Sequence, residues 1–319
     1  MASTARDRPS AAPDGPTDLD SGSKKGVLRR TFTEFQDDNL TDWAAALTYY
    51  GVLSIFPALL ALVSVVGLLG ESTTQSLIDN VEQAAPGPAR DIVVSAIENL
   101  SNQGSAGILF VVGLAGALWS ASGYVAAFMR ASNSIYDIGE GRPIYKTLPV
   151  RIGTTLVLVI LLAITALAVA ITGPLAEEVG SLVGLGDTAV TVWDVAKWPV
   201  LFLVVSFMFA FLYWAAPNAK QPGFRWISPG GMLGVAIWIV ASALFALYVA
   251  SFASYNETYG SLGGVIAFLV WLWISNLAIL IGAEFNAELE RGRRIEAGDV
   301  GPDEEPFVEP RDTKKLDDR

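Results

Sequence analysis

The stretch WAAALTYYGVLSIFPALLALVSVVGLLG, residues 43–70, contains no Asp, Glu, Lys or Arg. A helix of roughly 20 mainly apolar residues crosses a bilayer core about 30 Å thick, so this stretch is long enough to span a membrane. It starts only after a long polar segment and exceeds the apolar region of a signal peptide. We therefore expect it to remain in the mature chain as a membrane helix.

Charge-free stretches of similar length recur along the chain. They are Asn99–Met129, Ile152–Ala176, Trp198–Ala219, Ile227–Asn256 and Thr258–Ala283. Backbone polar groups in lipid must be paired within the structure, which favours helices. We predict an all-α polytopic membrane protein, a bundle of six transmembrane helices at about 43–69, 107–130, 150–172, 195–216, 229–252 and 262–288.

The composition supports a membrane protein and excludes several chemistries. Charged residues make up 17% of the chain and the mean hydropathy is +0.45, whereas a soluble domain carries about 25% charged residues. There is no Cys and no His, which excludes disulfides, His-ligated haem and zinc sites built on His or Cys. No nucleotide-binding or nucleophile motif is visible. We predict no catalytic residue, no metal, no cofactor and no nucleic-acid partner, and thus not an enzyme.

The basic residues alternate between the two sides of the predicted bundle. One set of segments carries Lys24, Lys25, Arg29, Arg30, Arg130, Arg142, Lys146, Arg151, Lys220, Arg225, Arg291, Arg293 and Arg294, whereas the opposite loops carry Arg90 and Lys197. Cytoplasmic loops are enriched in Lys and Arg. The pattern predicts a bacterial cytoplasmic (inner) membrane protein with both termini in the cytoplasm, in contact with membrane lipids.

The segments outside the predicted spans differ in character. Residues 1–30 and the acidic residues 291–319 are too polar to form a core, so we expect two disordered cytoplasmic tails around a membrane domain of residues 31–290. Residues 31–42 fit either a short amphipathic helix on the inner leaflet or a segment that only leads into the first transmembrane helix. Apolar residues at helical spacing within 77–100 predict two short amphipathic helices in an outer loop.

Glu284 is the main candidate for a functional polar group. It lies near the cytoplasmic end of the last span and shares a helix face with Asn276, eight residues before it. An ionisable group at membrane depth is expected to be paired, to face a cavity or to serve a pathway. Two interpretations stay open: an ion pair with Arg130 or Arg151 that locks the bundle, or a polar path in which Glu284 titrates or holds a cationic group.

Polar groups near the first span are weaker candidates. Asp42 is expected to cap the helix N-terminus, and the hydroxyl groups of Tyr49 and Tyr50 to hydrogen-bond between helices. Pro57 lies mid-helix and predicts a kink, static or a hinge, with a freed carbonyl near Leu53 or Ser54.

The short outer turn before the last span contains Tyr255, Asn256 and Tyr259, which fit an aromatic interfacial belt or an outer gate. Gly230 and Gly234 form a pair of small residues one helical turn apart, which favours close helix packing.

Several segments, in this order, resemble the YihY/BrkB family of bacterial multi-pass membrane proteins. They are AAALTYY (44–50), SIFP (54–57), WSASG (119–123), NSIY (133–136), Tyr213, Pro217, PG (229–230), YGSLG (259–263), Trp271 and GAEFN (282–286). The resemblance covers nearly all of the apolar chain. It implies a six-helix inner-membrane protein of envelope maintenance, linked to serum resistance in some members and to export of a lipid or solute.

Two classes of function follow from this resemblance and the residues. The first is a transporter or flippase of an envelope lipid or amphipathic solute, and the alternative is a non-transporting structural or scaffold protein for envelope integrity. Some family members were once labelled ribonuclease BN. Metal-dependent phosphodiesterases rely on clustered His and carboxylate ligands, so the absence of His argues against a His-dependent zinc nuclease. Substrate, direction, coupling ion and oligomeric state do not follow from the sequence.

Overall fold

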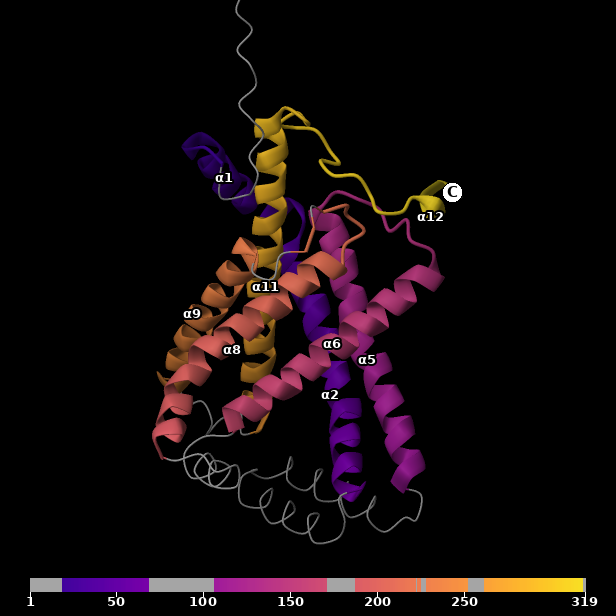
Figure 1. Ribbon diagram of the computed structural model, residues 1–319, viewed down its shortest axis with the longest axis vertical. Helices are drawn as coiled ribbons and strands as arrows, with labels where there is room; N and C mark the ends of the chain where they lie inside the picture. The colour runs from indigo at the N-terminus through magenta and orange to yellow at the C-terminus, as the bar shows by residue number, and fades with distance from the viewer. Residues whose placement is uncertain are drawn as a thin grey trace, which may run out of the picture.

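The computed structural model describes residues 19–68, 106–170, 187–221, 223–224, 228–251 and 261–317. Its described helices are α1 (Ser21–Asp37), α2 (Leu40–Leu68), α5 (Ala106–Ile135), α6 (Ile144–Ala170), α8 (Asp187–Ala215), α9 (Pro229–Ser251), α11 (Ser261–Ala297) and α12 (Lys314–Asp317) (Figure 1). The predicted all-α class is confirmed. The only β contact in these ranges is an isolated bridge between Ala219 and Pro310.

The long helices form a closed ring of neighbours. Each of α2, α5, α6, α8, α9 and α11 contacts the next in chain order, and α11 closes the ring against α2. The short helix α1 packs on α11 at one end of the bundle, beside the segment that leads to the C-terminus (Figure 1). The long helices that follow one another among the described elements are thus neighbours, as is usual in folded proteins.

Five described helices contain a segment long and apolar enough to cross a membrane. The segments are Val111–Ile135, Ile144–Thr165, Thr191–Ala215, Pro229–Val249 and Gly263–Ala297. In each segment most residues of the apolar window are not buried, and Leu162, Leu244 and Val265 are each more than half exposed. Exposed apolar side chains over whole helices are expected where lipid, not water, is the solvent. The first predicted span corresponds to α2, which is not among the five.

The core is concentrated at one end of the ring. We call this the polar end and define it by the loops 136–143 and 216–228, α1 and the C-terminal segment 298–317. Its buried cluster combines Leu47, Phe128, Leu212, Leu280 and Phe307 from separate elements. Farther from this end, no residue is buried within 156–165, 236–249 or 263–274. Buried residues of the described bundle are therefore concentrated in the half near the polar end.

The helix α11 is longer than a span requires. At 1.5 Å per residue, its 37 residues extend about 55 Å, against a bilayer core of about 30 Å. Its first charged residue is Glu284, which lies about 34 Å from the helix start. Glu284 consequently lies at the edge of the apolar layer. Beyond it, the helix continues to Ala297 instead of ending near residue 288 as predicted.

The C-terminal segment is ordered against the bundle, contrary to the disordered tail predicted for residues 291–319. Phe307 and Val308 are buried in the core cluster, and the backbone of Arg311 donates to the carbonyl of Asn218. The acidic composition of this segment gave no indication of its two buried apolar residues or of its backbone hydrogen bonds. The corresponding prediction for residues 1–30 is also wrong in part, because α1 begins at Ser21 with Asp20 as its N-cap.

Close packing of α9 on α11 depends on glycine, as the small-residue pair predicted. A Cβ atom at Gly282 would lie 2.5 Å from the carbonyl oxygen of Gly230 and 3.2 Å from the Cα of Gly234. The backbone N–H of Gly230 also donates to Asn286 Oδ1 at 2.8 Å. Any side chain at this crossing would separate the two helices.

Candidate functional site

Glu284 is buried at the polar end, with 1% of its surface exposed. The charges that act on it are carboxylates of Asp38, Glu288 and Glu34. Its Oε2 atom has no hydrogen-bond partner among the described residues, and Asp38, the first of these carboxylates, interacts with it most strongly. The site therefore favours a shared proton or an added positive charge.

The predicted ion pair of Glu284 with Arg130 or Arg151 is not formed in the part of the chain that the structure describes. The guanidinium of Arg130 instead lies 5.8 Å from the centre of the Tyr50 ring. Arg151 Nε donates to Ser122 Oγ at 2.8 Å. Helical spacing placed these groups at similar depth but did not reveal which face of the ring each occupies.

The cations near Glu284 are engaged by other acids. Arg30 forms an ion pair with Glu288, and Arg291 lies 3.3 Å from Glu34 and 3.4 Å from Glu305. Arg291 and Glu288 are both nearly inaccessible to solvent. The pairs therefore neutralise the surroundings of Glu284 and leave Glu284 itself without a cation.

Acids at the surface of this cluster also have shifted pKa values. Burial raises the pKa of Asp38, although the hydroxyl of Ser134 donates to it at 3.2 Å. Partial burial of the carboxyl group, with Glu305 and Asp38 nearby, raises the pKa of Asp137 to about 7. The ionised forms of these acids at the polar end are thus disfavoured near neutral pH.

Asn276 lies on the same buried face of α11 as Glu284, as predicted, and joins three helices. Its Nδ2 donates to Thr48 Oγ1 of α2 at 3.0 Å, and its Oδ1 accepts from the hydroxyl of Tyr124 of α5 at 2.8 Å. Thr48 in turn donates to the carbonyl of Ala44. The three side chains form a paired polar line within the core.

Of the other predicted residues of α2, Asp42 and Tyr49 are exposed, whereas Tyr50 is partly buried against the core. Asp42 is exposed in the first turn of the helix, which begins at Leu40, so it is not the N-cap but still favours the helix dipole. Tyr49 is 61% exposed, and its ring meets the ring of Tyr50 edge-on at 5.4 Å. Neither hydroxyl bonds to another described residue, and Tyr124 and Tyr213 make the bonds between helices instead.

The predicted freed carbonyl near Pro57 is present. Proline has no N–H, so the carbonyl of Leu53 lacks its usual partner within α2. The hydroxyl of Ser120 in α5 donates to this carbonyl at 3.0 Å. The polar group is therefore satisfied by a neighbouring helix, while the hinge role of Pro57 stays a prediction. The predicted outer-gate residues Tyr255, Asn256 and Tyr259, the outer loop 77–100 and residues 1–18 lie outside the described ranges.

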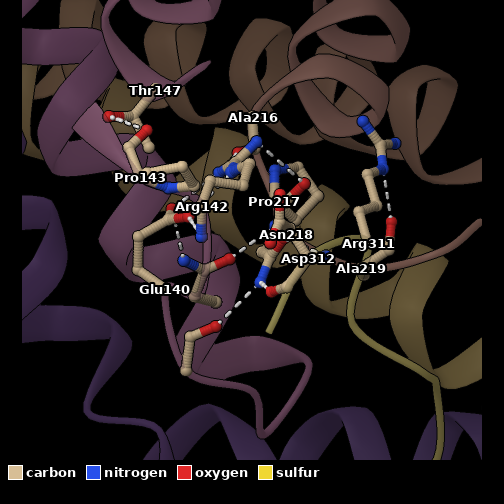
Figure 2. A network of polar contacts seen from close by, with 12 residues as sticks. Glu140, Arg142, Pro143, Thr147, Ala216, Pro217, Asn218, Ala219, Arg311 and Asp312 are labelled. Carbon is tan, nitrogen blue, oxygen red and sulfur yellow. Dashed lines mark hydrogen bonds and ion pairs between the residues drawn. The ribbon is translucent and has the colours of Figure 1, made fainter. Parts of the chain in front are cut away.

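A second polar network, which we call the clasp, joins the loops of the polar end through Arg142 and Asn218 (Figure 2). Arg142 is 5% exposed, binds Glu140 through two hydrogen bonds of 2.7 Å and donates to the carbonyl of Ala216 at 2.8 Å. Asn218 is fully buried and donates to the carbonyls of Gly139 and Asp312. The network ties both loops to the C-terminal segment.

The sequence reasoning missed this clasp and the polar line through Thr48 and Tyr124. Arg142 was interpreted as a marker of topology, and a basic loop residue offers no signal that its partners are backbone carbonyls far along the chain. The segment NSIY contains Asn133, whose Oδ1 accepts from the backbone of Asn218 at 2.7 Å. Its position in a motif was the one available hint.

The helical ring, its exposed apolar surface and its buried polar groups define a polytopic α-helical membrane protein. The chain belongs to the virulence factor BrkB family, which matches residues 31–306. YfkH of Bacillus subtilis (strain 168), described as a ribonuclease-like protein, is 34% identical over 88% of this chain and 98% of its own length.

Two further relatives are described as UPF0761 membrane proteins. MS0032 of Mannheimia succiniciproducens is 24% identical over 84% of this chain and 91% of its own length. A relative from Alkalilimnicola ehrlichii is 30% identical over 80% of this chain, which spans only 56% of that longer protein. No solved structure matches this one.

Proposed function

We propose that this chain is a bacterial inner-membrane protein of envelope maintenance that transports or flips a lipid or an amphipathic solute. In this proposal α2 is the sixth span and both termini are cytoplasmic. The observation that carries the proposal is Glu284, a buried acid surrounded by other acids and left without a cation. Such a group is costly to keep at the edge of a membrane unless it binds something.

The exposed apolar surface of the bundle supports a transport role. The half near the polar end contains most of the buried side chains, whereas 156–165, 236–249 and 263–274 have no buried residue. An amphipathic substrate needs apolar surface for its tail and a polar group for its head. The exposed apolar half supplies the first, and Glu284 with the polar line through Asn276 supplies the second.

The orientation is supported by the charge pattern and by the position of the basic residues. Arg30, Arg142, Lys146 and Arg291 all lie at the polar end, where their partners gather. Because cytoplasmic loops are rich in Lys and Arg, the polar end is the cytoplasmic one in this proposal.

Lipid movement in proteoliposomes tests the proposal. Wild-type protein, Glu284→Gln and Asp303→Asn are reconstituted with trace phosphatidylglycerol carrying a headgroup fluorophore, and a membrane-impermeant reductant measures how much of the inner-leaflet label becomes accessible. Asp303 is exposed, so it controls for carboxylate loss at the same end. We expect wild type and Asp303→Asn to move lipid and Glu284→Gln to be at least tenfold slower with an unchanged thermal midpoint. Equal flux in Glu284→Gln would remove the role of Glu284.

A scaffold protein is the alternative, and the clasped polar end is the observation that favours it. If the wild type moves no lipid and deletion of 77–100 abolishes recovery of partner proteins, the scaffold function replaces transport. The name of the Bacillus relative raises nuclease activity as another class. We propose that the chain is not an enzyme, because its sequence offers no catalytic motif and the absence of His argues against a His-dependent zinc nuclease. Metal-dependent cleavage of RNA by purified protein would overturn this.

A further inference from the structure

Two arginines on one outer face of the bundle have no acidic partner. Arg130 of α5 is exposed and its guanidinium lies over the Tyr50 ring. Arg151 of α6 lies 5.0 Å from the centre of the Trp119 ring. Among the described residues, neither forms an ion pair, although most other arginines of the polar end do. Arg311 also lacks an acidic partner in this part of the chain, but it donates to the carbonyls of Ala219 and Trp214.

The two guanidinium groups lie close enough to act on each other and on a shared neighbour. The charge of Arg130 and the hydroxyl of Tyr50 both influence Arg151. Arg151 is anchored on α5 at Ser122. The Tyr50 ring lies against the next residue, Gly123, where a Cβ atom would be 3.1 Å from it, and Arg130 lies over the same ring.

Both arginines lie inside segments apolar enough to span a membrane. Arg130 is five residues before the end of α5 and Arg151 seven residues after the start of α6, which is about 8–11 Å from the helix ends. Like charges at this depth repel each other and are costly without a counter-ion. The depth corresponds to the headgroup layer, where phosphate groups are concentrated.

The aromatic rings beside the two arginines lie open on the outside of the bundle, because Trp119 is 60% exposed and Tyr49 is 61% exposed. Arg151 is held in place by Ser122 and by the Trp119 ring, so its free N–H groups are preorganised. Guanidinium groups bind phosphate oxygens in a bidentate manner.

We infer that Arg130, Arg151 and the hydroxyl of Tyr50 form a binding site for the phosphate of an anionic phospholipid, seated between α2, α5 and α6 with its acyl chains along the exposed apolar surface of α6. The site goes beyond the proposed function, because it lies on the outside of the ring and requires no transport. The lipid neutralises two unpaired charges and joins three helices.

Native mass spectrometry of the purified full-length protein tests the site. Phosphatidylglycerol, phosphatidylcholine and inorganic phosphate are titrated separately into wild type, Arg130→Gln, Arg151→Gln, Arg130→Lys and Arg29→Gln. Arg29 is exposed on α1 and gives the same change of charge elsewhere at the polar end.

We expect the wild type to bind phosphatidylglycerol at least tenfold more tightly than phosphatidylcholine. Arg130→Gln and Arg151→Gln should each weaken it about tenfold, the effect of losing one charge-assisted hydrogen bond. The affinity of Arg130→Lys for phosphatidylglycerol should lie between those of wild type and Arg130→Gln, and the affinity of Arg29→Gln should match wild type. If Arg151→Gln fails to fold, Arg130→Gln decides, because its guanidinium contacts only a ring face.

Equal loss in Arg29→Gln and Arg130→Gln would overturn the site in favour of general charge attraction. Inorganic phosphate that competes fully with the lipid would overturn the lipid as the occupant. If Glu284→Gln loses lipid flux but still binds phosphatidylglycerol, the binding site is supported. Failure of the transport proposal can therefore be distinguished from failure of the binding site.

Discussion

Substitution of Gly282 by Ala tests how the ring is closed between α9 and α11. The new Cβ would lie 2.5 Å from the carbonyl oxygen of Gly230 and 2.5 Å from the hydroxyl of Tyr213, which itself donates to the carbonyl of Ile279. Because one contact is backbone, rotation of a side chain does not relieve it. Overpacking of this kind costs about 1–3 kcal/mol, which exceeds or offsets the gain of up to about 1 kcal/mol from replacing Gly in a helix.

The assay is thermal unfolding of detergent-solubilised protein followed by Trp fluorescence. The matched control is Gly264→Ala in the same helix, where a Cβ meets nothing within 4 Å. We expect Gly282→Ala to lower the unfolding midpoint and Gly264→Ala to leave it unchanged or raise it. Equal midpoints for the two variants would refute the close crossing of α9 and α11.

Three further predictions concern the core and the polar end. Thr48→Val should destabilise the fold by about 1–3 kcal/mol, because Asn276 Nδ2 loses its acceptor in the core; an unchanged unfolding midpoint would contradict this. Gly141→Ala should release the C-terminal segment, because its Cβ would overlap the carbonyl oxygen of Asp312; limited proteolysis should then cut after residue 300 much faster than in wild type, and an equal rate would contradict the clasp. The pKa of Asp137 is raised to about 7, so folding favours its protonated form. Its contribution to the free energy of unfolding is fully present below about pH 4 and is lost as the pH rises through 7. Asp137→Asn should therefore reduce the fall in unfolding midpoint over this pH range, and a pH profile identical to that of wild type would refute this.

Charge-free segments of hydrocarbon length were sufficient to predict the long helices. Predicted and observed starts agree within about one turn for α2, α5, α9 and α11, because a charge cannot enter lipid cheaply and its position marks the membrane edge. The helices α6 and α8 start six and eight residues earlier than predicted. The end of α11 also differs, because the helix continues well past Glu284, where Glu288 and Arg291 find partners on α1 and the C-terminal segment.

The candidate site was predictable only along a single helix. Periodicity placed Asn276 and Glu284 on one buried face, and the missing N–H of Pro57 indicated the unpaired carbonyl that Ser120 satisfies. Partners across helices were not predictable, because helix periodicity does not specify rotation about the axis or the neighbour it faces. Arg130 was therefore assigned to Glu284 although its contact is Tyr50.

Order in the tails was missed for a related reason. Composition averages over a segment, and two apolar residues, Phe307 and Val308, are enough to anchor an acidic stretch when they pack into the core cluster. Backbone hydrogen bonds to Asn218 then hold the stretch in place. These carry no compositional signal.

Membrane topology tests the central claim most directly, because every role above assigns the polar end to the cytoplasm. The chain has no Cys, so single substitutions Asp303→Cys, Lys220→Cys and Ser101→Cys can be labelled in intact cells with a membrane-impermeant maleimide, before and after permeabilisation. The account predicts that Ser101→Cys labels in intact cells and that the other two label only after permeabilisation. Labelling of Asp303→Cys from outside, or of Ser101→Cys and Lys220→Cys from the same side, would contradict it.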